Sequence, residues 1–382
     1  LKSIEEQLSQ LKPRLTMVSQ SVEPRVVRVL SRGDWQDESG PIVEPAIPAF
    51  MGELASDMQV ESRATRLDLA KWLTTAKKDG GGGELTARVF VNRMWYLFFG
   101  EGLSTSLDDF GGQGEYPNHP ELLDNLALDF ANDWDVKRLI KMIVSTRAYR
   151  MSSLADAEQL KSDPLNTHFS RQGRYRMPAE WIRDNALSVA GILVDKQGGD
   201  AAKPYQPEGY FQHLNFPMRS YKSDANENQW KRGVYMHWQR QFLHPMLKAF
   251  DAPSREECSA RRPRSNTPTA ALTMMNDPTF VEAARVLAEI SLKQDQLKTD
   301  DERVRWMLRR AISRQPSSVD IAPLVELLKL SRQSFAASSA EAEALAGQGS
   351  YPADSSLDKT ECAVFTQVAR AILNLHETAA RN

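Results

Sequence analysis

The sequence is poor in cysteine, has no long apolar run and carries almost no net charge. Its only cysteines, Cys258 and Cys362, lie far apart in a chain of 382 residues. Neither belongs to a CxxC or CxxCH motif, which excludes a cysteine-based zinc knuckle and an attached c-type haem in this stretch. The two thiols can pair in an oxidising compartment or stay free, and their number alone does not decide between these states.

Other absences narrow the class of protein further. No run approaches the roughly 18 apolar residues of a membrane-spanning helix, so we expect no membrane span. The formal net charge of −2 gives no general attraction to nucleic acid, and we expect no nucleic-acid partner. The chain begins at Leu1, with neither an initiating methionine nor a signal peptide. We therefore expect a piece of a longer protein whose targeting segment lies outside this sequence.

Common catalytic signatures are missing too. The sequence contains no G-x-S-x-G elbow, P-loop, Rossmann fingerprint or HExxH motif. A Ser-His-Asp triad stays open, because triads are defined by geometry and not by spacing.

What the sequence does contain is helical periodicity. Hydrophobic residues make up 41% of the chain, and their spacing predicts helices over 66–78, 85–100, 119–133, 134–150, 178–195, 232–249, 267–276, 277–293, 301–313, 320–334 and 360–378. Proline marks four of these helix starts, because its missing N–H has no intrahelical acceptor at the first position. Those prolines are Pro120, Pro178, Pro268 and Pro278. Thr267 and Asp277 are expected to cap two consecutive helices.

The remaining segments predict connections. The run DGGGGE at 79–84 is typical of a flexible break. Segments 198–230 and 335–358 are loop-rich, and the second is small and polar enough to be mobile. The fold class is therefore predicted to be mainly α: a multi-helix orthogonal array with long loops and an extended N-terminal arm.

Two stretches differ in their predicted organisation. Residues 1–50 contain the end of a preceding helix, over 3–15, and an extended linker arm in which 25–30 is weakly strand-like. Residues 51–382 are expected to form one helical domain, divisible into sub-blocks 51–195 and 196–382.

The acidic turn, DDFGGQGEYPNHPELLD at 108–124, has three interpretations. Asp108, Asp109 and Glu115 offer hard oxygen ligands for calcium, although their spacing is not that of an EF-hand. Asp108, Asp109 and His119 are also the candidate acid–base residues if the protein is an enzyme. The favoured interpretation is a helix entrance, with the aspartates bonding loop amides and the glycines permitting positive φ.

The arginine segment, 255–266, precedes the predicted helix start at Thr267. Guanidinium groups bind carboxylate or sulfate at two points, and a helix N-terminus attracts anions. The segment therefore predicts a pocket for an anionic ligand, such as a sulfated or uronic sugar or a haem propionate. The alternative is that these arginines pair with internal carboxylates such as Asp108, Asp109 or Glu121. The candidate ligand-binding residues are Arg261, Arg262, Arg264, Asn266 and Trp238, the last as an aromatic platform for a sugar ring.

Two histidines lie seven residues apart, His237 and His244, and are predicted to share a helix face two turns apart. That separation is too large for one metal ion without further ligands, among which His213 is the nearest candidate. Packing and capping roles are favoured.

Several long stretches together resemble one known family. They are RLDLAKWL, NRMWYLFFGEGLSTSLDDFGGQGEYPNHPELLD, WDVKRLIKMIVSTRAYRMSS, YQPEGYFQHLNFP, the stretch from HWQRQF at 237 to VLAE at 289, and VARAILNLHET. They resemble the planctomycete-specific C-terminal domain of unknown function, over roughly residues 66 to 378. That domain is usually found in large exported proteins, downstream of a planctomycete-type cytochrome c domain and a companion domain.

The resemblance implies a setting and gives no catalytic residues. It implies an exported or periplasmic protein with a c-type haem in its upstream part, and an association with the breakdown of sulfated polysaccharide. We therefore expect no cofactor within this chain, with calcium as an open candidate. The first functional hypothesis is a helical module that binds a partner domain or an anionic glycan. The alternative is a glycan-active enzyme, either a hydrolase or an oxidoreductase that passes electrons to the upstream haem.

Overall fold

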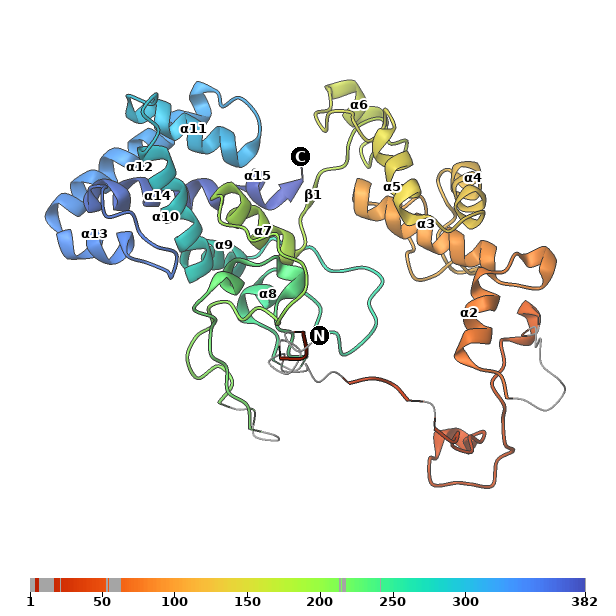
Figure 1. Ribbon diagram of the computed structural model, residues 1–382. Helices are drawn as coiled ribbons and strands as arrows, with labels where there is room; N and C mark the ends of the chain where they lie inside the picture. Colours follow the sequence, from red (N-terminus) through yellow and green to blue (C-terminus); the bar gives the residue numbers. More distant parts are fainter. Residues whose placement is uncertain are drawn as a thin grey trace. The chain divides into compact units, whose positions relative to one another are not determined.

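A computed structural model describes residues 4–6, 17–20, 22–52, 54, 63–212, 214, 218–240 and 242–381. As predicted, the chain is mainly helical (Figure 1). Its contacts divide it into two compact units, residues 1–87 and 88–382. None of the helices described is long and apolar enough to cross a membrane.

The first unit begins with the arm. Residues 4–6 are helical, and most of the helix predicted over 3–15 lies outside the described residues. The weakly strand-like stretch folds back on itself: the Val29 amide donates to the Pro41 carbonyl and the Val43 amide to the Val27 carbonyl. This pairing is a single bridge, between Arg28 and Ile42, and not a full strand. Two short 3-10 turns, η1 (Ser31–Gly33) and η2 (Ala49–Met51), interrupt the extended path.

The glycine run at 79–84, predicted as a flexible break, is a hydrogen-bonded turn. Helix α2 (Arg66–Thr74) begins with a capping box at Thr65 and ends before η3 (Lys77–Asp79). The Gly82 amide then donates to the Trp72 carbonyl at 2.8 Å. A Cβ on Gly82 would lie 2.7 Å from the Trp72 ring. Glycine is therefore required here by the close approach of the backbone to the indole, and α3 (Gly83–Phe99) starts directly after it.

The second unit continues with three helices, α4 (Pro120–Ala131), α5 (Val136–Ser145) and α6 (Ala157–Ser162). The Phe90 ring of α3 stacks on Phe130 of α4 at 4.9 Å between ring centroids. Arg138 fastens the α4–α5 turn by ion pairs to Asp129 and Asp133. The short helix α6 was not predicted from the sequence.

The core of the second unit forms around α10 (Pro278–Leu292) and α14 (Lys359–Leu373), which pack along each other (Figure 1). Every residue of α10 from Thr279 to Glu289 is buried. Around this pair pack α7 (Ala179–Val189), α9 (Pro268–Asn276), α11 (Asp300–Ile312), α12 (Ser318–Ala337) and α13 (Ser339–Ala346). Burying a charged side chain is costly unless it is paired or hydrogen-bonded, and the three buried charged residues of α10, Glu282, Arg285 and Glu289, all have such partners.

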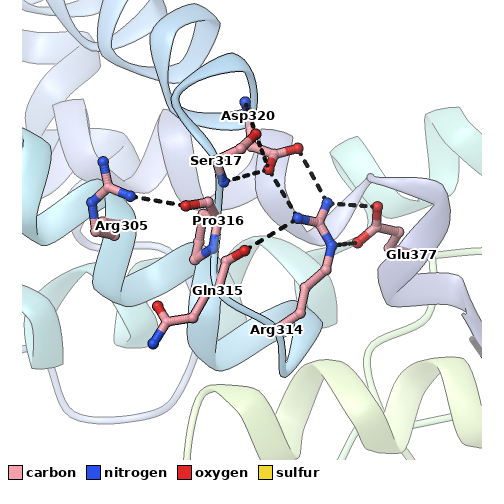
Figure 2. Close-up of polar contacts among 7 residues, drawn as sticks. All are labelled: Arg305, Arg314, Gln315, Pro316, Ser317, Asp320 and Glu377. Carbon is pink, nitrogen blue, oxygen red and sulfur yellow. Dashed lines mark hydrogen bonds and ion pairs between the residues drawn. The ribbon is translucent and has the colours of Figure 1, made fainter. Parts of the chain in front are cut away.

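Helix caps confirm the predicted starts. Thr267 accepts from the Ala270 amide at the N-terminus of α9, and Asp277 accepts from the Thr279 amide at that of α10. Capping boxes at Thr299 and Ser317 begin α11 and α12. Figure 2 shows how Arg314, between these two helices, reaches both Asp320 and Glu377 at 2.9 Å. The helix turn is thereby tied to α15 (His376–Ala379).

Two sequence predictions of local structure were wrong. Residues 232–249 are not one helix: they contain η5 (Gly233–Tyr235), an extended stretch, and the short α8 (Pro245–Ala249). The amides of Ala202 and His237 form hydrogen bonds with the Tyr235 and Ala202 carbonyls, so this stretch pairs with a distant segment instead of coiling. The stretch 335–358, predicted as a mobile loop, is helical in its first part, where it extends α12 and contains α13, and is a loop over 347–358.

A small sheet was also missed. Strand β1 (Tyr175–Arg176) pairs antiparallel with β2 (Ala380–Arg381). Each strand has two residues, which is too short for an alternating pattern to be visible in the sequence. The 3-10 helix η4 (Glu227–Trp230) completes the elements that position the site described next.

Candidate functional site

Helix α7 provides one wall of the candidate site. Its apolar residues Ile182, Ala186 and Leu187 are buried in the core, which turns Trp181 outward, with 45% of its surface exposed. Arg183 follows and is completely buried. Its guanidinium donates to the carbonyls of Gln229 and Lys231, both at 2.6 Å.

The buried Arg183 is the anchor for the segment after η4. Burial lowers the pKa of its guanidinium, against the neighbouring carboxylate of Asp184. Burial conversely raises the pKa of Asp184, which accepts from the Gly233 amide. Because these bonds fix residues 229–233, the exposed Arg232 and Val234 are held beside α7.

The arginine segment supplies the opposite wall, and each guanidinium has its own partner. Arg262 pairs with the buried Glu180 of α7 at 2.7 Å, and Arg261 pairs with Glu101 at 2.5 Å. Arg264 lies over two rings, 4.7 Å from the Tyr96 centroid and 4.6 Å from that of Tyr175. It also donates to the Gly100 carbonyl at 3.1 Å.

Arg255 is held in a different way. Its guanidinium carbon lies 3.7 Å from the centroid of the Trp238 ring, a cation–π contact. Its φ of 64° is in the left-handed region, which is costly for a residue other than glycine. The stack and the strained backbone together direct this side chain toward the cavity that it lines.

These walls enclose a cavity of about 390 Å³, the arginine pocket. Five arginines line it, contributed by α3, the 229–234 segment and the arginine segment: Arg93, Arg232, Arg255, Arg262 and Arg264. The carboxylates at its surface are Glu180, Asp184 and Asp251. Glu180 is engaged by Arg262, Asp184 by the Gly233 amide, and Asp251 by the amide and hydroxyl of Ser265.

The balance of charge in the arginine pocket is therefore positive. Arg93 is exposed on α3 and has no polar partner among the described residues. Among the described residues, Arg232 forms an ion pair with Asp195 alone, whose side chain is 66% exposed, so solvent screens that pair. Trp181 adds an aromatic face on the rim. The chemistry favoured by five guanidinium groups beside an indole is the binding of an anionic, partly apolar ligand.

The acidic turn does not join the arginine pocket. Asp108 is exposed, and Asp109 accepts from the Gly111 amide at 2.7 Å, a loop bond of the kind expected at a helix entrance. Glu115 is exposed as well. None of these three carboxylates contacts an arginine of the arginine segment within the described part of the chain. The predicted partners Asp108, Asp109 and Glu121 are replaced by Glu101 and Glu180, which lie nearer in the fold.

His119 also lies apart from the arginines. It occupies the position before Pro120 at the start of α4, without a side-chain capping bond. Its Nε2 is 3.0 Å from the Thr167 carbonyl, and its ring lies beside His168 and Phe169. The acid–base and calcium roles of these residues stay predictions. Within the ranges described, no group of three histidine, cysteine or acidic side chains is arranged to hold a metal ion.

The remaining predicted residues have structural contacts. Asn266 accepts from the Arg176 guanidinium at 2.8 Å and does not line the arginine pocket. Trp238 supports Arg255 from outside the cavity, and its indole donates to the Ser254 carbonyl. The prediction that the two histidines share a helix face was wrong, because His237 lies in the extended stretch while His244 caps α8. His213 lies outside the described residues.

Both cysteines are free, Cys258 exposed and Cys362 buried.

Arg93, Arg232 and Trp181 were missed by the sequence analysis. They come from three separate segments, and isolated arginines on a helix surface are too common to single out. Trp181 did carry a signal, since a tryptophan on the polar face of an amphipathic helix is unusual.

A family model described as PSD1, a protein of unknown function (DUF1553), matches residues 65–328. The chain belongs to this family. The match includes α7, the arginine segment and every residue that lines the arginine pocket. No curated protein matches the chain, and no solved structure matches it.

Proposed function

We propose that this chain is a binding module for acidic or sulfated polysaccharide. The observation that carries the proposal is the arginine pocket, in which five guanidinium groups from three segments line one cavity beside an exposed indole. Its volume is that of a small-ligand site. A sulfated or uronic sugar offers both an anion for the guanidinium groups and an apolar ring face for Trp181.

The free state of Arg93 supports a ligand over a structural ion-pair network. A network that only stabilised the fold would pair each guanidinium with a carboxylate of the chain. Arg262 and Arg261 do pair in this way. Arg93 does not, among the described contacts, and Arg255 stacks on an aromatic ring instead of a carboxylate. The guanidinium N–H groups of Arg93 and Arg255 are therefore available to bind an external anion.

For the parent protein we propose the setting that the sequence resemblance implies. The chain would be the planctomycete-specific C-terminal module of an exported, periplasmic protein with cytochrome c and companion domains upstream. Binding of polysaccharide would then hold that larger protein on its glycan. Contact with the upstream domains is part of this proposal and does not use the arginine pocket.

The direct test is calorimetric titration of the protein with a sulfated oligosaccharide. We expect Arg93→Ala to weaken binding by about 1.5–3 kcal/mol, the value of a charged hydrogen bond, or roughly tenfold to a hundredfold in Kd. Arg93 is suited to this test because it is exposed and alanine is a good helix former, so the fold is unaffected.

Arg309→Ala is the matched control. Arg309 is an exposed arginine in the last turn of α11 and does not line the arginine pocket. The control should bind as the unchanged protein does. If the Arg93 and Arg309 variants bind equally well, or if no acidic or sulfated glycan binds at all, the proposed function is wrong.

A further inference from the structure

Arg264 also lines a second cavity. It has a volume of about 460 Å³ and is lined by residues of 99–101, 153–155, 160–175 and Arg264; we refer to it as the Arg171 cavity. Its polar lining includes Arg171, Arg174, Asn166, Gln172 and Glu101, whose carboxylate pairs with Arg261. Its rim includes the exposed Leu154 and Leu165. None of the acidic-turn residues proposed as ligands or catalysts lines it.

Arg171 is an unusual residue to find at the wall of a cavity. Only 7% of it is exposed. One terminal nitrogen, Nη2, donates to the carbonyls of Asp163 and Pro164 at 2.9 and 3.1 Å. The other, Nη1, is buried without a hydrogen-bond partner in the described chain. A buried charged donor without an acceptor is costly, so a ligand oxygen that reaches this nitrogen gains more than it would from an exposed donor.

The backbone around the Arg171 cavity is built to hold this side chain in place. The Asn166 side-chain amide donates to the Arg171 carbonyl at 2.9 Å, and the Asp163 carboxylate accepts from the amides of Thr167 and His168. Asn166 and Phe169 both have positive φ, of 56° and 49°. Such strain persists only where the surrounding contacts fix it. Arg171 is therefore positioned before any ligand arrives.

Arg264 connects the two cavities, because it lines both. Its guanidinium lies over the Tyr96 and Tyr175 rings, which fix its plane. One of its donors is used by the Gly100 carbonyl. A guanidinium carries five N–H donors, so further donors are available to anions. Tyr96 and Tyr175 are buried, and their low-polarity surroundings strengthen the attraction of the guanidinium for an anion.

We propose that the two cavities are consecutive subsites for one polyanionic oligosaccharide. One acidic or sulfated sugar occupies the arginine pocket, the next anionic group enters the Arg171 cavity and bonds Arg171, and Arg264 lies between them. This inference rests on the proposed function and specifies its ligand as a chain with repeated negative charge, not a single acidic sugar. The exposed leucines contact the non-polar faces of the second sugar.

The test is the dependence of affinity on the length of the ligand. Chondroitin sulfate oligosaccharides of two, four and six sugars are the probes, measured calorimetrically with the full chain. We expect a gain of roughly tenfold or more from the disaccharide to the tetrasaccharide, because the second subsite is filled at no further cost of association. A longer chain that merely offers more binding positions gains less than this.

Leu165→Glu separates the two subsites. Leu165 is 80% exposed on the rim of the Arg171 cavity, so a carboxylate there repels a second anion without disturbing the core. We expect this variant to lose the gain with length and to bind the disaccharide normally. Leu128→Glu, on the exposed face of α4, is the matched control and should behave as the unchanged protein. Arg171→Gln should reproduce Leu165→Glu, provided that its thermal unfolding shows it to be folded.

The outcomes are distinguishable from failure of the proposed function. If the disaccharide binds through Arg93 but affinity does not rise with length, the second subsite is excluded while the arginine pocket stands. The same holds if Leu165→Glu retains the full gain. If no oligosaccharide of any length binds, both proposals fall together.

Discussion

At the scale of single residues, the buried His244 has a strongly shifted pKa, because burial favours its neutral ring. His244 is 4% exposed and uses both ring nitrogens: Nε2 lies 2.7 Å from the Tyr205 carbonyl, and Nδ1 accepts from the Met246 amide at 3.3 Å. A carbonyl on one nitrogen and an amide N–H on the other fit only the neutral ring with its proton on Nε2. Burial accordingly lowers the pKa of His244 to about 4.

The consequence is a pH dependence of stability. In the unfolded chain the pKa of His244 is near 6.5. Between that pH and about pH 4, the unfolded state binds a proton at His244 and the folded state does not. The stability contributed by neutral His244 is complete above pH 6.5 and is lost as the pH falls toward about 4. The loss is at most about 3 kcal/mol, from the size of the pKa shift.

His244→Asn isolates this effect. Asparagine is a strong N-cap, so it keeps the capping role at α8 and does not titrate. Urea unfolding between pH 7 and pH 4 should show a shallower decrease in stability for the variant than for the unchanged protein. Parallel curves for the two proteins would show that His244 does not titrate as described.

At the scale of elements, buried polar groups fasten loops to helices. Glu282 of α10 is completely buried and accepts from the Tyr205 hydroxyl, the Trp230 indole and the amides of Ser350 and Tyr351. This one carboxylate fixes the connection between α13 and α14 to the core. Hydrogen bonds to the core therefore hold part of the segment 335–358, which its composition predicted to be mobile.

Gly349→Ala tests that attachment. Gly349 has a φ of 100°, and a Cβ there would collide with the Glu282 carboxylate. We expect the variant to lose about 2 kcal/mol of unfolding free energy, from the strained backbone and the displaced carboxylate. The matched control is Gly347→Ala, two residues earlier, where φ is −96° and a Cβ meets nothing closer than 3.3 Å. Equal stability of the two variants would contradict the proposed role of Glu282.

Elements with local signals were predictable from the sequence, and elements set by distant contacts were not. Pro120, Pro268 and Pro278 mark helix starts because the proline effect is contained in one turn. The stretch 232–249 has helix-like spacing, yet hydrogen bonds to Ala202 override it. Helix α13 shows the opposite case: its alanine and glutamate residues favour a helix locally, although the composition of the whole segment is that of a loop.

The candidate site follows the same division. Arg262 and Arg264 were predictable because they lie together before a helix. Arg93 lies about 170 positions earlier, and only the fold brings it to the same cavity. The alternative that the arginine segment pairs with carboxylates of the acidic turn is not observed, because Arg261 and Arg262 pair with Glu101 and Glu180 instead.

At the scale of the whole molecule, the family match and the compact unit end at different places. The match stops at residue 328, inside α12, whereas α14 lies beyond it at the centre of the core. The side chains of Val364, Phe365, Val368 and Ile372 are fully or almost fully buried. Removing α14 exposes its contact face on α10, and each large side chain uncovered costs roughly 1.5–3 kcal/mol. The sum approaches the whole stability of a typical domain.

We therefore expect a fragment 63–328 to lack a cooperative unfolding transition. A fragment 63–382, which retains α2 to α15, should unfold cooperatively on heating, as followed by circular dichroism at 222 nm. Cooperative unfolding of the shorter fragment would show that α14 is dispensable and that the core is smaller than described.

The central claim is that the arginine pocket binds an anionic glycan, and arginine footprinting tests it most directly. The protein is treated with phenylglyoxal, which modifies accessible guanidinium groups, with and without a saturating sulfated oligosaccharide, and each arginine is read by mass spectrometry. We expect the ligand to protect Arg93, Arg232 and Arg255 while Arg309 on α11 reacts at an unchanged rate. Equal modification of these arginines in the presence and absence of the bound ligand would contradict the central claim.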